Sequence, residues 1–345
     1  MKKKVLFIMG TAHCGSTLLT MVLGGHSDCL AIGELSNLPD LYGRGRPVCS
    51  ACDGECTLWD RRFSADDYEL LCAGLAEQRL HKHIPLKLEK AFRGALKTDQ
   101  VFNPYTLIAS KVEEPIIVDS TKTVYWLEKK LAAREFRQDM IEPYLLHLIR
   151  DGRAVMASYS RRKVYQDMSD EQFGRSFGKM WQARLKNEYR FYDKFAKRFG
   201  GRYADHQRRF RYETFATQPE EMAKSLCDWL GIPFERNMLD YRNHKNHIIS
   251  GNERTKATVQ RHQRQEGIEQ KASKESPWKQ HHESEKMSKV ATETVAEKSA
   301  IQDFGIKLNQ QWKDILSEAQ IAAFYRATNR MNERYEWNCS APLRS

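Results

Sequence analysis

Residues 5–17, VLFIMGTAHCGST, combine within one short stretch the features of an anion-binding loop. The run over residues 5–9 is apolar and partly β-branched and stops at a glycine, which predicts a buried parallel strand. A loop bounded by Gly10 and Gly15 follows, and a helical pattern begins directly after it. In such an arrangement the N–H groups of the loop and of the helix N-terminus converge on one point and favour a phosphate there. We therefore predict that the chain binds a phosphorylated ligand.

The spacing of this loop is also that of a nucleoside-triphosphate P-loop, with one difference. Gly10, Gly15 and Thr17 hold positions of the motif, but Ser16 stands where the motif requires lysine. That lysine contacts the β- and γ-phosphates, so its absence argues against hydrolysis of ATP or GTP. A second apolar run ends in Asp119, as the metal-holding strand of nucleotide hydrolases does. A P-loop nucleotide kinase or hydrolase therefore stays open as an alternative.

A second group of basic residues follows the strand predicted over residues 144–149. Arg150 comes at the end of this strand, and a helical pattern runs from Ala154 through Ser158 and Arg162. Four residues apart on a helix, Ser158 and Arg162 would share a face. Two guanidinium groups and a hydroxyl converging there would form a second phosphate site, distinct from the first.

Strand patterns alternate with helical patterns along the chain, which predicts a parallel, doubly wound α/β sheet. Ligands of such sheets bind at the carboxyl ends of the strands, where Gly15, Asp119 and Arg150 would face one crevice. A further strand is predicted over residues 208–213. Capping boxes at Thr217 and Ser317 predict two helix starts.

Three closely spaced cysteines could ligate a metal. Cys49, Cys52 and Cys56 could give three thiolates to a zinc ion, but no fourth ligand is visible nearby. The alternative is a reduced cluster in a structured loop. The chain has eight cysteines and no secretion signal, which favours free thiols over a disulfide framework.

Length and composition favour one domain over residues 1–345, with a cysteine-bearing insertion around residues 40–60 and a polar, mobile insertion around residues 255–305. The net charge of +11 implies affinity for anions. Without a zinc-finger, RRM or KH signature, that charge indicates a small phosphorylated ligand and no nucleic acid. No transmembrane span is visible, and the first apolar run is too short for a signal peptide, so we expect a cytoplasmic protein.

With these motifs in hand, the chain resembles the sulfotransferases that use 3′-phosphoadenosine 5′-phosphosulfate (PAPS). The resemblance is carried by GTAHCGSTLL at residues 10–19 and IRDGRAVMASYSRR at residues 149–162. The second motif looks especially like the bacterial and tyrosylprotein branch of the family. The resemblance implies a three-layer α/β/α fold and an enzyme that moves a sulfuryl group from PAPS to a hydroxyl acceptor by in-line transfer, without a metal.

The resemblance also implies roles for individual residues. Glu34 matches the general base, and Lys122 and His13 match groups that stabilise the transition state. The residues that match PAPS-binding positions are His13, Cys14, Gly15, Ser16, Thr17, Arg150, Ser158, Arg162, Tyr212, Gly251, Asn252 and Arg254.

One departure from the family pattern concerns His13, which stands where the family usually has arginine or lysine. A histidine can stabilise the leaving phosphate oxygen as imidazolium or as a neutral hydrogen-bond donor, with weaker electrostatics. A catalytically impaired nucleotide-binding protein is therefore a further alternative. The sequence does not distinguish among acceptors, which in related enzymes include small molecules, sugars, lipids and protein tyrosines.

Overall fold

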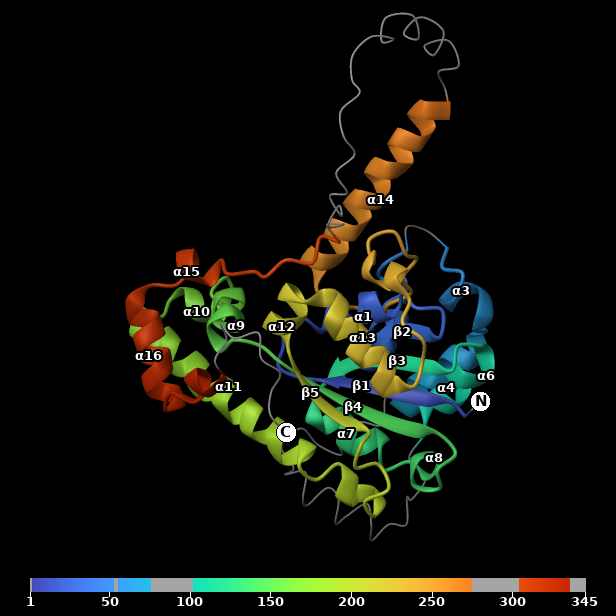
Figure 1. The fold of residues 1–345 in the computed structure, drawn as a ribbon, viewed down its shortest axis with the longest axis horizontal. Coiled ribbons are helices and arrows are strands. Elements are labelled where there is room, and N and C mark those ends of the chain that lie inside the picture. Colours follow the sequence, from blue (N-terminus) through green and yellow to red (C-terminus); the bar gives the residue numbers. More distant parts are fainter. Residues whose placement is uncertain (1, 53–54, 76–101, 275–303, 336–345) are drawn as a thin grey trace, which may run out of the picture.

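A parallel sheet of five strands forms the centre of the computed structural model, which describes residues 2–52, 55–75, 102–274 and 304–335 (Figure 1). The strand order is β2-β3-β1-β4-β5, and every neighbouring pair is parallel. The predicted α/β fold with a parallel sheet is thus confirmed. The strands are β1 (Lys4–Met9), β2 (Cys29–Gly33), β3 (Ile116–Lys122), β4 (Glu142–Ile149) and β5 (Gln207–Arg211).

The central strand β1 is apolar at almost every position because both of its faces are covered. Val5, Phe7 and Met9 belong to one buried cluster, whereas Leu6 and Ile8 belong to another. This alternation follows from the two-residue repeat of a strand, and a strand buried on both faces reads as a continuous apolar run. Helices therefore lie on both faces of the sheet, in three α/β/α layers (Figure 1).

The helices divide among three buried clusters. The cluster around Leu6 receives α1 (Ser16–Leu23), α12 (Tyr212–Thr217), α13 (Pro219–Leu230), η3 (Arg236–Leu239) and the start of α14 (Glu253–Lys274). The cluster around Phe7 receives η1 (Leu35–Asn37), α2 (Leu38–Gly43), α3 (Trp59–Arg62), α4 (Ala65–Leu75), α6 (Pro104–Lys111), α7 (Val124–Lys130), α8 (Arg134–Arg137) and η2 (Ala196–Phe199). The third cluster receives α9 (Gly152–Tyr159), α10 (Lys163–Gln166), α11 (Asp170–Tyr192), α15 (Trp312–Ile315), α16 (Glu318–Thr328) and η4 (Met331–Tyr335).

A short segment before α14 extends the sheet beyond its edge strand β2. Ile249 forms a parallel bridge with Gly33, in which its N–H donates to Ile32 O at 2.8 Å and its carbonyl accepts from Glu34 N at 2.7 Å. Gly33 has a φ of +75°, and a Cβ there would lie 2.6 Å from Ile249 O. Only glycine allows the two backbones to approach this closely.

Several predicted boundaries differ from the structure. The predicted strand over residues 208–213 ends at Arg211, and Tyr212 begins α12. Thr217 caps no helix, because α13 begins after Gln218 and the Thr217 hydroxyl donates back to Glu213 O at 2.9 Å. Ser317 does form the predicted capping box, with Gln320, at the start of α16.

The predicted polar insertion around residues 255–305 begins as a helix, α14, which extends away from the sheet layers (Figure 1). Residues 275–303 of this insertion lie outside the described residues. Among the helices that the structure describes, none is long and apolar enough to cross a membrane.

Replacing Gly33 with alanine tests the contact between β2 and Ile249. We expect Gly33→Ala to lower the free energy of unfolding by about 2–4 kcal/mol, because a Cβ adds left-handed backbone strain to a clash with the Ile249 backbone. Urea unfolding measures the effect. Gly43→Ala is the matched control, since Gly43 has open space around it and should lose less than about 1 kcal/mol. Equal stability of both variants would contradict the close approach.

Candidate functional site

The loop between β1 and α1 presents a helix N-terminus at the carboxyl edge of the sheet. Gly15 has a φ of +96°, and Ser16 begins α1. The ring of Tyr212 lies directly against Gly15, in the space that a Cβ would occupy. The first N–H groups of a helix lack partners within the helix and attract anions. The fold therefore places a helix N-terminus where the sequence predicts a phosphate site, and phosphate binding there stays a prediction.

A cavity of about 470 Å³ opens in front of this helix N-terminus. It brings together the loop before α1, the basic motif that begins at Arg150 and the region around residue 250. Of the predicted site residues, its lining includes His13, Gly15, Ser16, Thr17, Glu34, Lys122, Arg150, Ser158, Arg162, Tyr212, Gly251, Asn252 and Arg254.

Among the residues predicted to bind PAPS, Cys14 alone does not line this cavity. Its side chain is fully buried in the cluster around Leu6, and its N–H donates to Thr11 O at 3.2 Å. Cys14 thus packs the loop against the core, and neither its thiol nor its amide is directed to the cavity.

Glu34 and Lys122 form an ion pair in the cavity wall. Glu34 directly follows β2, and Lys122 ends β3 in a left-handed conformation, with φ of +66°. The second carboxylate oxygen of Glu34 accepts from the Asn37 side chain at 3.2 Å. The two residues expected to act on the acceptor and on the transferred group are therefore adjacent, although 88 positions separate them in the sequence.

Arg150 is held rigidly at the end of β4. Its Nη1 donates to His13 O at 2.8 Å, and its guanidinium lies 4.2 Å from the centre of the Tyr212 ring. Within the described part of the chain, its buried Nε has no hydrogen-bond partner. An anionic ligand in the cavity could accept from this group, because a buried donor gains free energy when it finds an acceptor.

Ser158 and Arg162 do not share one helix, contrary to the sequence prediction. Helix α9 ends at Tyr159, and Arg162 lies in the turn before α10. Its guanidinium packs over the Tyr159 ring at 3.8 Å and reaches His13 Nε2 at 3.2 Å. Arg162 still reaches the cavity with Ser158, through this stacking on Tyr159 rather than through helical spacing.

His13 adopts a left-handed conformation, with φ of +65°, and is surrounded by cations. Burial, followed by the charges of Arg162, Arg150 and Lys122, lowers the pKa of His13 to about 4. A guanidinium only donates hydrogen bonds, so His13 Nε2 accepts from Arg162 and the imidazole proton is on Nδ1. Near neutral pH, His13 is therefore a neutral hydrogen-bond donor.

The segment after Ile249 closes the cavity from the other side. Asn252 donates its N–H to Thr17 Oγ1 at 3.0 Å, and its side-chain oxygen accepts from the N–H groups of Arg254 and Thr255 at the start of α14. Gly251, with φ of +127°, packs against Thr17. The segment with Gly251 and Asn252, two residues predicted to bind PAPS, thus contacts the start of α1 directly.

Lys307 and Asn309 also line the cavity, and the sequence analysis did not identify them. Asn309 also lines an adjoining cavity of about 420 Å³, whose wall shares His13, Arg150 and Ser158 with the first. Neither residue belongs to a motif with a recognisable spacing. Lys307 and Asn309 are identified as lining residues only because the structure places the chain after residue 303 at the cavity.

Asp119 lies away from the cavity, contrary to the expectation that it faces the crevice. It sits in the middle of β3, is fully buried, and accepts from Tyr105, from Trp126 Nε1 at 2.9 Å and from Thr121 N at 2.7 Å. Burial raises its pKa. A carboxylate with these partners links β3 to α6 and α7 and is not available to a metal-bound nucleotide.

Comparison with known proteins finds a family similarity for the middle of the chain. Residues 142–236, which span β4 to α13, match the model of a sulfotransferase family. This match covers less than half of the chain and shows that residues 142–236 are similar to that family. The branch within the family is not distinguished by this match and stays a prediction. None of the curated proteins compared with the sequence matches it.

Solved structures similar to this chain are also sulfotransferases. The sulfotransferase domain from the curacin biosynthetic pathway has 19% sequence identity and a TM-score of 0.43, over 72% of this chain and 81% of that one. The sulfotransferase domain of the Synechococcus PCC 7002 olefin synthase has 18% identity and a TM-score of 0.41, over 73% and 80%. Sulfotransferase STF9 from Mycobacterium avium has 12% identity and a TM-score of 0.38, over 69% and 66%. All three TM-scores are below 0.5, so the fold assignment rests on the sheet itself.

The charge state of His13 can be measured directly. In the free protein we expect the His13 imidazole to stay neutral down to about pH 5, because its pKa is lowered to about 4. NMR titration of the ring resonances, assigned with His13→Gln, measures the midpoint. An anionic nucleotide should shift this midpoint upward, because nearby negative charge favours the imidazolium. A midpoint near 6.5 in the free protein would contradict the burial and the cationic surroundings of His13.

Proposed function

We propose that this chain transfers a sulfuryl group from PAPS to a hydroxyl acceptor. The observation that carries the proposal is the composition of the 470 Å³ cavity. Among the described lining residues, Lys122, Arg150, Arg162, Arg254 and Lys307 are cationic, and Glu34 is the one carboxylate. This arrangement suits a highly anionic donor together with a single base.

The two ends of the donor would occupy different parts of the cavity wall. The 5′-phosphosulfate would bind at the start of α1, where Ser16 and Thr17 supply N–H groups and hydroxyls. The 3′-phosphate would bind at Arg150 and Ser158, with Arg162 nearby. Support comes from the unpartnered Nε of Arg150 and the exposed position of Ser158 on α9.

Transfer would begin with the separation of the Glu34–Lys122 ion pair. The sulfonate of the donor competes for the Lys122 ammonium, which leaves the Glu34 carboxylate free to accept the proton of the acceptor hydroxyl. The acceptor oxygen then bonds to sulfur as the bond from sulfur to the bridging phosphate oxygen breaks. Catalysis by positioning and by stabilisation of spread negative charge suits such an in-line transfer. Adenosine 3′,5′-bisphosphate leaves with the electron pair of the broken bond.

His13 would support the leaving oxygen as a neutral donor or, after the donor raises its pKa, as an imidazolium. Its Nδ1–H is the group available for this role, because Nε2 faces Arg162. A fixed hydrogen-bond donor stabilises the developing negative charge less than a full cation does, but it still lowers the free-energy barrier to transfer.

The acceptor would enter beside Glu34. We propose that acceptor choice depends on the segments over residues 36–110 and 255–305. Support comes from Thr255 and Thr258 at the start of α14, which line the cavity within reach of Arg254. The nucleotide kinase or hydrolase alternative gains no support from this site, since Asp119 is buried and fully hydrogen-bonded away from it.

The role of Arg150 predicts a selective loss of nucleotide affinity. Arg150→Ala should weaken binding of adenosine 3′,5′-bisphosphate about 10- to 100-fold, because a charged hydrogen bond to the 3′-phosphate is lost. Binding of adenosine 5′-phosphate should change far less. Calorimetric titration gives both affinities, with Arg175→Ala as the control, since Arg175 is exposed on α11 and pairs with Glu171. Equal losses for both nucleotides would refute the assignment of Arg150 to the 3′-phosphate.

The role of Glu34 predicts a loss of rate without a loss of binding. Glu34→Gln should reduce turnover about 10²- to 10⁴-fold, the usual range for removal of a general base. Its affinity for adenosine 3′,5′-bisphosphate should stay within about threefold of the parent protein, because the general-base role leaves nucleotide contacts in place. Sulfate transfer from radiolabelled PAPS to a panel of hydroxyl acceptors measures turnover, and Glu69→Gln, exposed on α4, is the control. Collapse of nucleotide binding in Glu34→Gln would instead indicate a structural role.

A further inference from the structure

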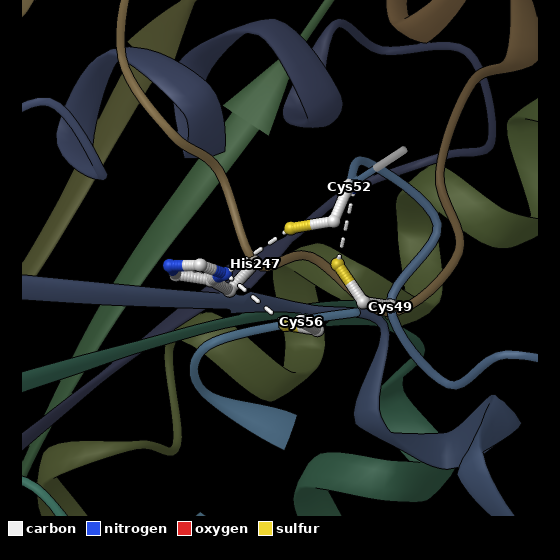
Figure 2. A group of neighbouring side chains, drawn as sticks. All are labelled: Cys49, Cys52, Cys56 and His247. Carbon is white, nitrogen blue, oxygen red and sulfur yellow. Dashed lines mark hydrogen bonds between the residues drawn. The ribbon is translucent and has the colours of Figure 1, made fainter. Parts of the chain in front are cut away.

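Three cysteines of one loop lie close to a histidine in the distant segment that pairs with the edge strand β2. The ligand atoms of Cys49, Cys52, Cys56 and His247 all lie within 4.8 Å of one another (Figure 2). His247 Nδ1 lies 3.5 Å from Cys52 Sγ and 3.2 Å from Cys56 Sγ. The sequence analysis identified three of these possible ligands but not the fourth, because His247 is 191 positions beyond Cys56.

The separations of these atoms match those of a zinc coordination sphere. With Zn–S near 2.3 Å and Zn–N near 2.0–2.1 Å in tetrahedral geometry, ligand atoms lie about 3.5–3.8 Å apart. Of the two S···N distances, 3.5 Å lies at the lower end of this range and 3.2 Å lies just below it. Three sulfurs and one imidazole nitrogen form one of the ligand sets of structural zinc sites.

Backbone N–H groups point at two of the sulfurs. Cys52 N donates to Cys49 Sγ, and Trp59 N donates to Cys56 Sγ, both at 3.4 Å (Figure 2 shows the first). Such donors stabilise negative charge on sulfur, and thiolate is the form that ligates metal. In both cases the donor N–H belongs to the residue three positions after the cysteine.

Buried side chains hold the loop and the histidine segment together. Trp59 is fully buried, and its Nε1 donates to His247 O at 2.6 Å. Tyr68 OH donates to Trp59 O at 2.8 Å, and Ser50 N donates to Ile248 O at 2.9 Å. Ligands fixed by a supporting shell bind a metal without large reorganisation.

We propose that Cys49, Cys52, Cys56 and His247 bind a structural Zn²⁺ ion. All four positions are taken by protein ligands, so the ion has no open position for a substrate and acts as a cross-link. It connects the loop after α2 to the segment that carries Ile249, Gly251 and Asn252. Because Ile249 pairs with Gly33 and Asn252 contacts Thr17, the ion also stabilises one wall of the nucleotide cavity.

Metal analysis of the untagged protein, purified without chelator, tests this proposal on the native chain. We expect about one zinc per chain, with X-ray absorption showing three sulfur neighbours and one nitrogen. Less than about a tenth of that zinc, even after reconstitution under reducing conditions with equimolar Zn²⁺, would overturn the proposal. A disulfide among the three cysteines, found by mass spectrometry of the freshly purified protein that also lacks zinc, would overturn it as well.

Variants of His247, the fourth ligand, test zinc binding without removing any of the three cysteines, so the protein need not unfold. His247→Ala should lower zinc affinity at least about 10- to 100-fold in competition with a chromophoric chelator, whereas His247→Cys should restore much of it as a four-cysteine site. Cys72→Ser, which alters a half-buried cysteine outside the cluster, should keep the full zinc content. Unchanged zinc affinity in His247→Ala would exclude His247 as a ligand. These readouts do not require sulfotransferase activity, so their outcome is separate from that of the proposed function.

Discussion

The pairing of Ile249 with Gly33 is the contact on which both sites of this protein depend. Glu34 follows Gly33 directly and is the one acid that lines the 470 Å³ cavity among the described residues. In the bridging segment, His247 precedes Ile249 and lies close to the three cysteines, while Asn252 follows it and contacts Thr17. Two backbone hydrogen bonds at the edge of a parallel sheet thus set the register of the cavity wall and of the cysteine cluster together.

The second constraint is the repulsion among cations that face one cavity. Lys122 is neutralised by Glu34, and the pKa of His13 is lowered, so that two of the basic groups carry little net charge before an anion binds. Arg150 is fixed between His13 O and Tyr212 rather than by a carboxylate. His13 and Lys122 also have positive φ values, and strained backbone of this kind persists where the surrounding structure holds it. The basic groups of the cavity are therefore held in place by their protein contacts, without a carboxylate partner for Arg150.

The local elements were largely readable from the sequence, because their signals are local. Strand patterns in the sequence predicted β1, β3, β4 and, with a later end, β5, and Ser317 with Gln320 predicted the start of α16. The errors arose where tertiary contacts overrode a local pattern. Thr217 bonds back to Glu213 rather than capping α13, and α9 stops at Tyr159, whose ring packs against Phe177 and under Arg162.

The sequence by itself determined the chemistry available to this protein: an anion-binding loop, a second basic motif, and a carboxylate and three thiols that needed partners. Residue types and short spacings carry that information, because each depends on neighbours within a few positions. Only the tertiary structure decided which distant groups meet. It put Lys122 on Glu34, His247 among the cysteines, and Asp119 in the core instead of at the cavity. Such pairings depend on strand order and sheet register, which long-range backbone hydrogen bonds fix and no local pattern encodes.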